Sequence, residues 1–255
     1  MAQGMFGGMI KAGYLASDII VTGTNVEKLA KKAEKFGVQT TLDNKEAAKA
    51  DVVVLAVKPH QFQGVIHEIK EVISDEALVI SVAAGITLAQ MSEWFGKEMK
   101  LVRTMPNTPS LVGEGMAALV PNERVTEAEL SYVQKIFNSF GKSQVVAEEA
   151  LHGVIAVAGS SPAYVYMFIE ALADGAVLQG IPRAQAYELA SQAVLGAAKM
   201  VLETGMHPGA LKDAVCSPGG TTIEAVVELE KSGMRQSVLK AMAACADKSR
   251  EMSKG

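Results

Sequence analysis

Several residue types are scarce in this 255-residue chain, and each scarcity excludes a class of protein. Only two cysteines, one tryptophan and 5% aromatic residues are present. Cys216 and Cys245 form no CxxC pair, which argues against a disulfide framework and predicts reduced thiols in a cytoplasmic protein. The four histidines are scattered, and none is paired at the spacing of metal ligands. We therefore expect no metal site.

An excess of basic charge is also lacking. Lys and Arg number 24 against 28 Asp and Glu, and no basic stripe is visible, so we expect no nucleic-acid partner. Residues 151–178 are long and apolar, as in a membrane span. However, Glu170 and Asp174 lie near the end of this segment, and residues 159–162 (GSSP) interrupt it. We therefore expect no membrane partner, and predict a buried helix pair or a helix at a subunit interface.

The first half of the chain alternates short β-branched runs with helical patterns. The patterns predict strands at 18–22, 51–57, 78–82, 100–104, 116–120 and 143–146, and helices at 25–36, 60–73 and 126–140. Two of the strands, 51–57 and 78–82, are continuously apolar, as parallel strands covered on both faces are. This alternation predicts a doubly wound α/β sheet.

The second half contains no strand pattern. Its predicted helices are 151–179, 182–203, 208–215, 221–231 and 234–252. We therefore predict an α/β domain over 1–147 and an all-α domain over 148–255. The helical faces are rich in Ala, Gly and Met, which favours an intertwined homodimer, with a monomeric bundle as the alternative.

Three predicted strand ends carry small residues or proline, at 56–59 (AVKP), 83–85 (AAG) and 105–109 (MPNTP). Ligands of open α/β sheets lie beyond the carboxyl ends of the strands, and small residues let a flat cofactor approach the backbone. The glycine-rich GxGxxG loop of nucleotide-binding sheets is missing, since the GxG at 113–115 precedes a strand. Each strand-end motif alone is also a common turn.

The sharpest motif lies in the helical half, where residues 217–220 (SPGG) form a turn before a helix that opens with Thr221 and Thr222. Free N–H groups at the start of that helix would bind a small anion such as a carboxylate, with the Thr222 hydroxyl beside it. The alternative is an ordinary helix start with threonine as the capping residue.

With these motifs, the chain resembles the pyrroline-5-carboxylate reductase family. The resemblance covers nearly the whole chain and rests on 208–230 (PGALKDAVCSPGGTTIEAVVELE), AVKP, SVAAG at 81–85, RTMPNTP at 103–109 and GSSPAY at 159–164. It implies a Rossmann-type N-terminal domain, a helical dimerisation domain, NAD(P)H as hydride donor and often a decamer of five dimers. The implied activity is reduction of the cyclic imine of 1-pyrroline-5-carboxylate to L-proline, the last step of proline synthesis.

The resemblance also implies roles for individual residues. The amides around Gly219, Gly220 and Thr221 would hold the substrate carboxylate, and the Thr222 hydroxyl would hydrogen-bond the ring nitrogen as the catalytic group. Asn107 and Glu148 would lie near the substrate, although Glu148 reads equally well as a carboxylate at a helix start. The cofactor would be held by Thr24, Asn44, Ala56, Val57, Lys58, Pro59, Ala83, Ala84 and Gly85.

The cofactor preference is predicted from the end of the first predicted strand. NAD-preferring sites place Asp or Glu there, whereas this chain has Thr22, Gly23, Thr24 and Asn25, with Lys28 one turn away. We therefore expect NADPH. Relatives place Arg in this loop and this chain does not, so use of NADH as well stays open.

Three alternatives remain. A reductase of β-hydroxy acids would need Lys or His as a proton carrier at the helical motif, which offers only Thr and Ser. A reductase of the homologous six-membered imine stays open, because one methylene changes binding by only about 1–3 kcal/mol. A catalytically impaired, truncated chain could serve only as a helical dimer scaffold.

The last alternative arises from the first fifteen residues, MAQGMFGGMIKAGYL, which resemble the first helix of the family. Met1 matches the methionine that closes the phosphate loop of the family. We therefore expect a first strand and glycine loop before Met1 in the working protein, and expect a chain starting at Met1 to bind cofactor poorly. A buried strand of about five apolar side chains, at roughly 1.5–3 kcal/mol each, would carry much of the stability of a domain.

Overall fold

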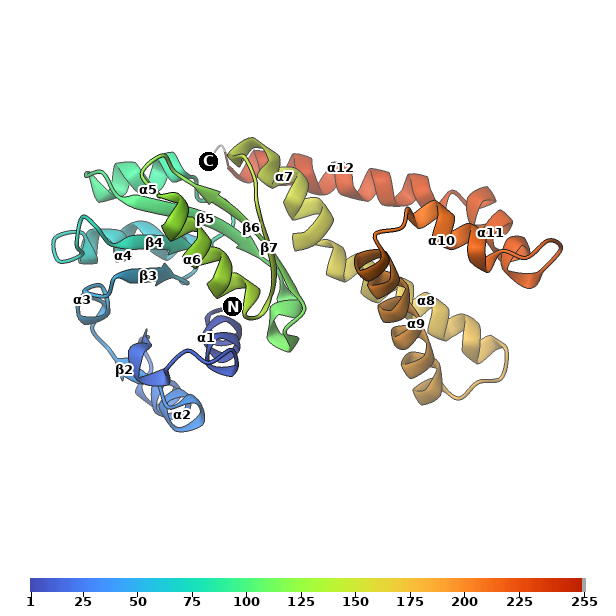
Figure 1. The fold of residues 1–255 in the computed structure, drawn as a ribbon, viewed down its shortest axis with the longest axis horizontal. Coiled ribbons are helices and arrows are strands. Elements are labelled where there is room, and N and C mark those ends of the chain that lie inside the picture. The colour runs from blue at the N-terminus through green and yellow to red at the C-terminus, as the bar shows by residue number, and fades with distance from the viewer. Residues whose placement is uncertain (254–255) are drawn as a thin grey trace. The chain divides into compact units, whose positions relative to one another are not determined.

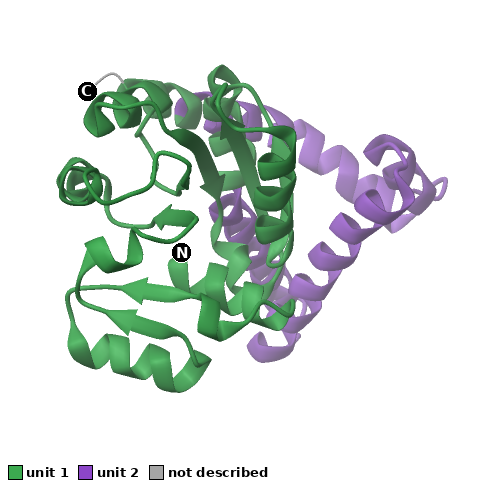
Figure 2. Ribbon diagram, turned by 60° about the vertical axis from the view of Figure 1, so that its left-hand side comes forward, with its two compact units in different colours: residues 1–160, 245–255 green, residues 161–244 purple. Residues whose placement is uncertain are grey.

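The computed structural model describes residues 1–253, which form two compact units. One unit, here called the sheet unit, comprises residues 1–160 and the end of the chain from residue 245; the other, the helical unit, comprises residues 161–244 (Figure 2). The predicted division at residue 148 thus falls before the point at which the helical unit begins. Each unit is described by itself below.

The sheet unit contains all six predicted strands and one more (Figure 1). They are β1 (Ile20–Thr22), β2 (Gln39–Thr41), β3 (Val52–Leu55), β4 (Leu78–Ser81), β5 (Lys100–Pro106), β6 (Gly115–Pro121) and β7 (Gly141–Val145). Strands β3 to β7 form one sheet in sequence order, whereas β1 and β2 form a separate parallel pair. The strand that the prediction missed, β2, has the sequence Gln-Thr-Thr and so lacks the apolar signal of a buried strand.

Helices cover both faces of the five-stranded sheet, which confirms the doubly wound α/β class. The helices of this half are α1 (Ala2–Lys11), α2 (Val26–Phe36), α3 (Asn44–Ala47), α4 (Phe62–Ile69), α5 (Leu88–Phe95) and α6 (Glu127–Asn138), of which α2 packs on the separate strand β1 through Leu29 and Val21. One face packs against α4 and α5, through side chains such as Phe62 and Met91. The other packs against α1 and α6, through Met5 and Phe137. Each face therefore has its own apolar core within one chain.

Capping residues explain where several of these helices begin. Asn25 accepts a hydrogen bond from the Lys28 amide at the start of α2, and Thr126 forms a capping box with Glu129 at the start of α6, as predicted. The predicted helix 60–73 is shorter, since it opens with a 3₁₀ turn at Pro59 and its α-helical part ends at Ile69. Helix α5 was not predicted.

The second half contains helices and no strand within its described residues, as predicted. Its helices are α7 (Leu151–Val154), α8 (Ser161–Leu178), α9 (Arg183–Thr204), α10 (Pro208–Val215), α11 (Thr221–Lys231) and α12 (Met234–Met252). The predicted helix 151–179 is interrupted by a π-helical turn at Ile155–Gly159, where the Ser160 amide donates to the Ile155 carbonyl at 2.8 Å. Pro162 contributes to the interruption because it has no amide N–H to donate.

Burial within the helical unit is slight. Of residues 161–244, all of which the structure describes, only Ala173, Ala186 and Ala190 are buried. Large apolar side chains of α8 are exposed instead, among them Met167 at 69% and Phe168 at 38%. By length and composition alone, the stretch 148–178 could cross a membrane, and 6% of its apolar window is buried.

Candidate active site

The three strand-end motifs lie at one edge of the sheet. Strands β3, β4 and β5 are parallel neighbours, so the residues that follow Leu55, Ser81 and Pro106 share the carboxyl edge. Ala56 and Ala84 are exposed there. Gly85 has a φ of +83°, a conformation that strains residues with a side chain. Small, accessible residues at this edge fit the approach of a flat nicotinamide ring.

The other strand-end residues frame this edge. Ala83 is 5% exposed, and its amide donates to the Ser81 hydroxyl at 3.4 Å. This hydrogen bond ties the start of the loop after β4 to the last residue of the strand. Val57 packs on the core beneath α4. Lys58 and Pro59 are exposed at the start of the 3₁₀ turn that leads into α4. All the predicted residues of these two loops therefore lie at the edge or directly under it.

Two further predicted cofactor residues, Thr24 and Asn44, lie near β1 and β2. Thr24 is exposed in the loop between β1 and α2, and no Asp or Glu occurs in residues 22–25. Asn44 is the first residue of α3, and its side-chain amide donates to the Glu68 carboxylate of α4 at 2.9 Å. The Asn44 side chain therefore joins two helices, and its predicted role beside the adenine stays a prediction.

Asn107 follows β5 and is 9% exposed. Its side-chain nitrogen donates to the Ala158 carbonyl at 2.9 Å, and its side-chain oxygen accepts from the Met116 amide at 2.9 Å. Both ends of the amide are thus engaged between β6 and the π-helical turn. The predicted contact with substrate would have to use a remaining hydrogen-bonding position of this side chain.

Glu148 lies beside a buried arginine that the sequence analysis did not single out. Arg103 on β5 is 2% exposed, and its Nη1 donates to Glu148 Oε1 at 2.7 Å. The same carboxylate oxygen accepts from the Leu88 amide, at the start of α5, at 3.0 Å. Glu148 therefore caps the start of a helix, as a helix-start carboxylate does. That helix is α5, whose Leu88 lies sixty residues earlier in the sequence. An arginine inside the apolar strand KLVRTMP was the available signal, because a buried charge must have a partner.

The second group of predicted residues surrounds the start of α11 in the helical unit. Gly219 has a φ of +65°, and Gly220 is the residue before the helix, whose first two members are Thr221 and Thr222. Within the described residues no side chain caps this helix start. The alternative with threonine as cap is therefore wrong. A Cβ at Gly220 would lie 2.3 Å from the Ser217 hydroxyl, which can rotate away, and 3.1 Å from the Ser217 carbonyl, so glycine is favoured more strongly at Gly219, where φ is positive.

This helix start can bind an anion because its first amides lack a side-chain acceptor. Helices α2, α5 and α6 each receive such an acceptor from Asn25, Thr87 or Thr126, whereas α11 does not. The half-buried Thr222 side chain adds a hydroxyl at the same end. Free amides, the positive end of the helix dipole and a hydroxyl together suit a carboxylate with a neighbouring polar atom.

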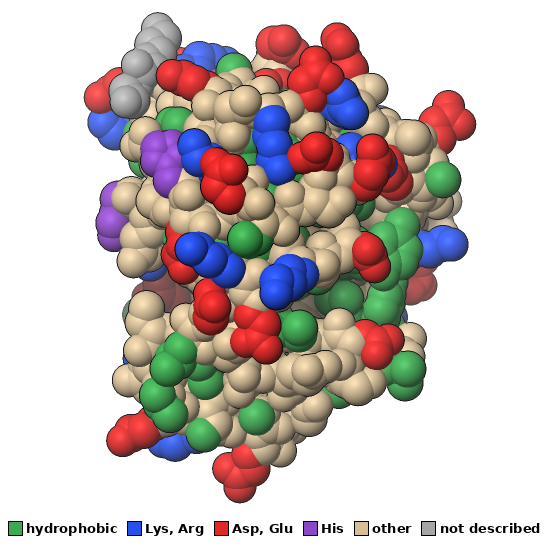
Figure 3. Space-filling view, turned by 90° about the vertical axis from the view of Figure 1, so that its left-hand side faces the viewer, with side chains coloured by type: hydrophobic (Ala, Val, Ile, Leu, Met, Phe, Trp, Pro, Cys, Tyr) green, Lys and Arg blue, Asp and Glu red, His purple; other side chains and the backbone are tan. Residues whose placement is uncertain are grey.

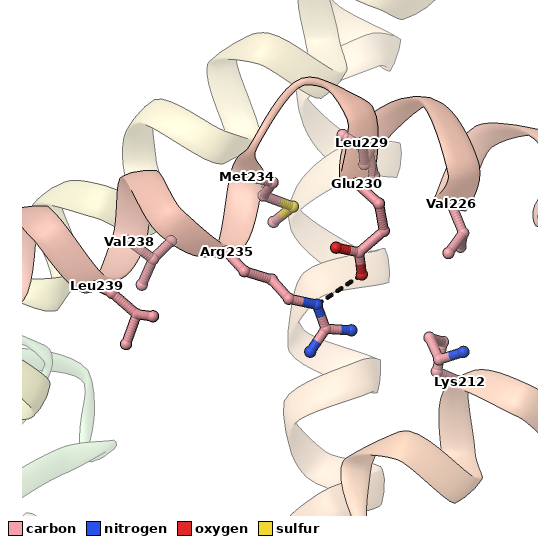
Figure 4. A pocket seen from close by; sticks show the side chains of 8 residues that line it. All are labelled: Lys212, Val226, Leu229, Glu230, Met234, Arg235, Val238 and Leu239. Atoms are coloured by element: carbon pink, nitrogen blue, oxygen red, sulfur yellow. Dashed lines mark hydrogen bonds and ion pairs between the residues drawn. The ribbon is translucent and has the colours of Figure 1, made fainter.

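The helical unit also contains a cavity of about 490 Å³ between α10, α11 and α12 (Figure 4). Its lining is mainly apolar, with Val226, Leu229, Met234, Val238 and Leu239, and includes Lys212, Glu230 and Arg235. Arg235 Nε donates to Glu230 Oε1 at 2.6 Å across it. None of the predicted site residues lines this cavity, so it is separate from the candidate anion site.

The surface charge is mixed. Over the face drawn in Figure 3, Lys and Arg side chains are interspersed with Asp and Glu, in keeping with the net charge of -4. This face therefore presents charges of both signs and not a continuous basic surface.

The comparisons with known proteins match both halves of the chain. The family model described as NADP oxidoreductase, coenzyme F420-dependent, matches residues 1–85, and that described as pyrroline-5-carboxylate reductase dimerisation matches residues 148–252. The pyrroline-5-carboxylate reductase of Escherichia coli K12 is 50% identical over 256 residues, which cover 100% of this chain and 95% of that protein.

Solved structures are similar over the same length. The pyrroline-5-carboxylate reductase of Coxiella burnetii is 40% identical with a TM-score of 0.96, covering 100% of this chain and 95% of its own. The pyrroline carboxylate reductase of Plasmodium falciparum, solved with NADP bound, is 32% identical with a TM-score of 0.87, covering 98% of this chain and 94% of its own.

Proposed function

The chain belongs to the pyrroline-5-carboxylate reductase family, and from this premise we propose that it reduces 1-pyrroline-5-carboxylate to L-proline with NAD(P)H. The observation that carries the proposal is the start of α11, where free amides and a threonine hydroxyl lie side by side. The substrate presents the matching pair of groups, because its carboxylate and its ring nitrogen are attached to the same ring carbon. An NAD(P)H-dependent reductase of this imine uses both groups to orient it.

The chain orients the substrate at two points. Among the amides around Gly219, Gly220 and Thr221, that of Gly220 already donates to the Ser217 carbonyl at 3.0 Å, so we assign the carboxylate to its neighbours and the ring nitrogen to the Thr222 hydroxyl. When bound at the edge of the sheet, NAD(P)H supplies the hydride for the imine carbon. The imine nitrogen is protonated before the transfer and keeps the electron pair of the broken π bond, so the neutral amine of proline forms without a covalent enzyme intermediate and then takes up a further proton from solvent. Since a protonated imine is already electrophilic, positioning accounts for most of the rate enhancement.

Thr222 is the residue to which we assign a direct catalytic role. Its hydroxyl can accept a hydrogen bond from the protonated imine and donate one to the amine that forms. A threonine hydroxyl is too weak an acid to protonate the nitrogen alone, so it acts as a polar anchor and a relay for a proton from solvent. Asn107 and Glu148 are held within the sheet unit by the contacts described above.

We also propose a preference for NADPH over NADH. The loop of residues 22–25 contains no carboxylate that would repel a 2′-phosphate, and Lys28 lies in the first turn of α2. Glu27 lies in the same turn, so the preference rests on the loop and not on the charge of the helix. The variant Thr24→Asp places a carboxylate there, and it should lower the ratio of kcat/KM for NADPH to that for NADH. An unchanged ratio would contradict this assignment.

The assembly is proposed to be a homodimer through the helical half, with the decamer of five dimers as a larger form. The exposed apolar side chains of α8 and the match of residues 148–252 to a dimerisation family support it. Covering these side chains with a second copy also accounts for the apolar stretch 148–178 without a membrane. The free cysteines Cys216 and Cys245 suit a reducing compartment such as the cytoplasm.

The deciding experiment mixes the purified chain with NADPH and pyrroline-5-carboxylate and follows the absorbance of the reduced cofactor. Oxidation that forms proline in equal amount supports the proposal. Turnover only with the six-membered homologue would assign the homologous imine as substrate. Absence of turnover with either imine, in a folded protein, would leave the chain a helical scaffold.

A further inference from the structure

A single carboxylate oxygen connects three distant segments of the sheet unit. Glu148 Oε1 accepts from Arg103 Nη1 on β5 at 2.7 Å and from the Leu88 amide of α5 at 3.0 Å. Glu148 itself begins the 3₁₀ turn that follows β7. The side chain of Arg103 is 3% exposed and that of Glu148 is 32% exposed. One end of this pair is therefore buried and the other borders solvent.

Such a pair is not explained by stability alone. Removing a guanidinium group from water is costly, and a buried ion pair is often no more stable than apolar residues of the same size. In addition, Arg103 Nε has no hydrogen-bond partner within the described residues. The arrangement is therefore better explained by what it holds in place.

The pair holds the segment between β4 and α5. Helix α5 already has a capping box of its own, in which Thr87 and Gln90 exchange hydrogen bonds. The Leu88 amide is left over from that box, and Glu148 accepts it. The carboxylate thus supplies a second, long-range cap with a negative charge at the positive end of the helix. This second cap anchors the start of α5 to β5 and to the segment after β7.

The segment anchored in this way is one of the proposed platforms of the cofactor. Ala83, Ala84 and Gly85 lie between the end of β4 and the capped start of α5. Gly85 has no side chain to hold it, and Ala84 is exposed. Ala83 is held by its bond to Ser81 and Ile86 is buried in the core, so the positions of Ala84 and Gly85 depend on these anchors and on the bond of the Leu88 amide just beyond them.

We propose that Glu148, held by Arg103, is a positioning residue for the nicotinamide end of the cofactor and not a substrate ligand. It acts through the Leu88 amide on residues 83–85. The inference rests on the proposed function, because it takes this edge of the sheet as the site of NAD(P)H. It replaces the expected contact of Glu148 with the substrate.

The test compares Glu148→Gln with the matched control Glu149→Gln. Both changes remove one negative charge, and the exposed Glu149 side chain makes no ion pair within residues 1–253. The first measurement is the Kd of NADPH without imine, by fluorescence titration well below the Tm of each variant. We expect Glu148→Gln to raise this Kd about tenfold, because a charge-assisted hydrogen bond is weakened, and Glu149→Gln to leave it unchanged.

Steady-state kinetics then separates positioning from substrate contact. At saturating NADPH, the KM for the imine should change less than twofold in Glu148→Gln. A raised KM for the imine with an unchanged Kd for NADPH would overturn the inference in favour of a substrate ligand. A lowered Tm with unchanged Kd and KM would overturn it in favour of a purely structural ion pair.

Variants of Arg103 provide a second test of the inference. Arg103→Lys keeps the charge, so it should raise the Kd of NADPH less than Arg103→Met does. In the Arg103→Met and Glu148→Gln double variant, the two effects on Kd should not multiply, because both act through one contact. Independent effects would overturn the inference. An inactive wild-type chain would instead refute the proposed function, which keeps the two failures distinguishable.

Discussion

The sheet unit and the helical unit bury their apolar side chains in different ways. The sheet unit encloses large residues completely, with Phe62, Phe137 and Ile80 all at 0% exposure. The helical unit buries only three alanines among its residues 161–244 and exposes Phe168, Met167 and Leu239. A sheet with helices on both faces completes its core within one chain, whereas helices α8 to α11 and the first part of α12 leave large apolar side chains exposed. The difference supports the proposed homodimer, in which a second copy covers the exposed apolar side chains of the helical unit.

The largest expected effect comes from placing a charge on the uncovered face. Phe168→Glu should abolish the dimer and with it the activity, because a twofold interface would bury the unpaired carboxylate twice, at a cost of more than about 5 kcal/mol. Analytical ultracentrifugation measures the assembly.

The matched control for this charge is Tyr132→Glu in the sheet unit. Tyr132 is an aromatic residue of α6 with 42% exposure against 38% for Phe168. The variant Tyr132→Glu should leave the mass of the assembly in analytical ultracentrifugation unchanged. If Phe168→Glu also kept the full mass, α8 would not form the interface and the comparison between the units would be broken.

A truncation in the core of the sheet unit should have the next largest effect. Phe137→Ala removes a fully buried ring between α6 and the sheet, which should lower the free energy of unfolding by about 3–5 kcal/mol. Chemical denaturation at several protein concentrations measures it. We expect this loss to be independent of concentration, whereas the loss in Phe168→Ala should depend on concentration. The same dependence in both variants would contradict independent folding of the sheet unit.

A smaller effect, confined to turnover, is expected at the start of α11. Thr222→Ala removes a hydroxyl assigned to a charged nitrogen, which is worth about 1.5–3 kcal/mol, or ~10–100-fold in kcat. The Kd of NADPH should change less than twofold, since the cofactor residues lie in the sheet unit. Steady-state kinetics and titration measure both.

The neighbouring Thr221→Ala is the control for Thr222. Only the backbone amide of Thr221 is assigned a role, so this variant should keep at least half of the wild-type kcat. Equal losses in the two variants would indicate a general disturbance of the helix, and an unchanged kcat in Thr222→Ala would remove Thr222 from the mechanism.

The smallest expected effect is the loss of stability when an ion pair is removed, which we compare between the sheet unit and the helical unit. In the sheet unit, Lys100 Nζ bonds Glu129 at 2.8 Å and Glu76 at 2.6 Å. The hydrogen bond from Lys100, with that from the Thr126 amide, lowers the pKa of Glu129 to about 2. Glu129→Gln should therefore reduce stability at pH 7 by about 1 kcal/mol, after allowance for solvent screening.

The pH dependence of this loss has a definite sign. A carboxyl with a lowered folded pKa stabilises the protein above its unfolded pKa, near 4.5, and that contribution disappears as the pH falls toward about 2. The wild type and Glu129→Gln should thus converge in urea denaturation over this range. Glu203→Gln, in the exposed pair with Lys199 of α9, should change stability by less than about 0.5 kcal/mol at any pH. A larger change there would contradict the contrast between the units.

Local patterns were sufficient to predict most elements. The caps at Asn25 and Thr126 and the alternation of apolar runs with helices depend on neighbours within a few residues, so they are readable in one dimension. The polar strand β2 was missed because it carries no such pattern, and the helix 151–179 was predicted without its π-helical turn. The strand-end motifs were placed at one edge correctly, because parallel strands align their carboxyl ends.

The sequence by itself determined the class of fold, the family and the groups that surround the start of α11, since these depend on composition, spacing and motifs. Only the tertiary structure decided what Glu148, Asn107 and Arg103 contact. Glu148 accepts from residues forty-five and sixty positions away, and Asn107 donates to a carbonyl fifty-one positions away. Such partners are chosen by the packing of strands and helices, because a long-range hydrogen bond leaves no periodic trace in the chain. The sequence therefore singled out the Glu148 carboxylate, and the tertiary structure determined that it caps the start of α5.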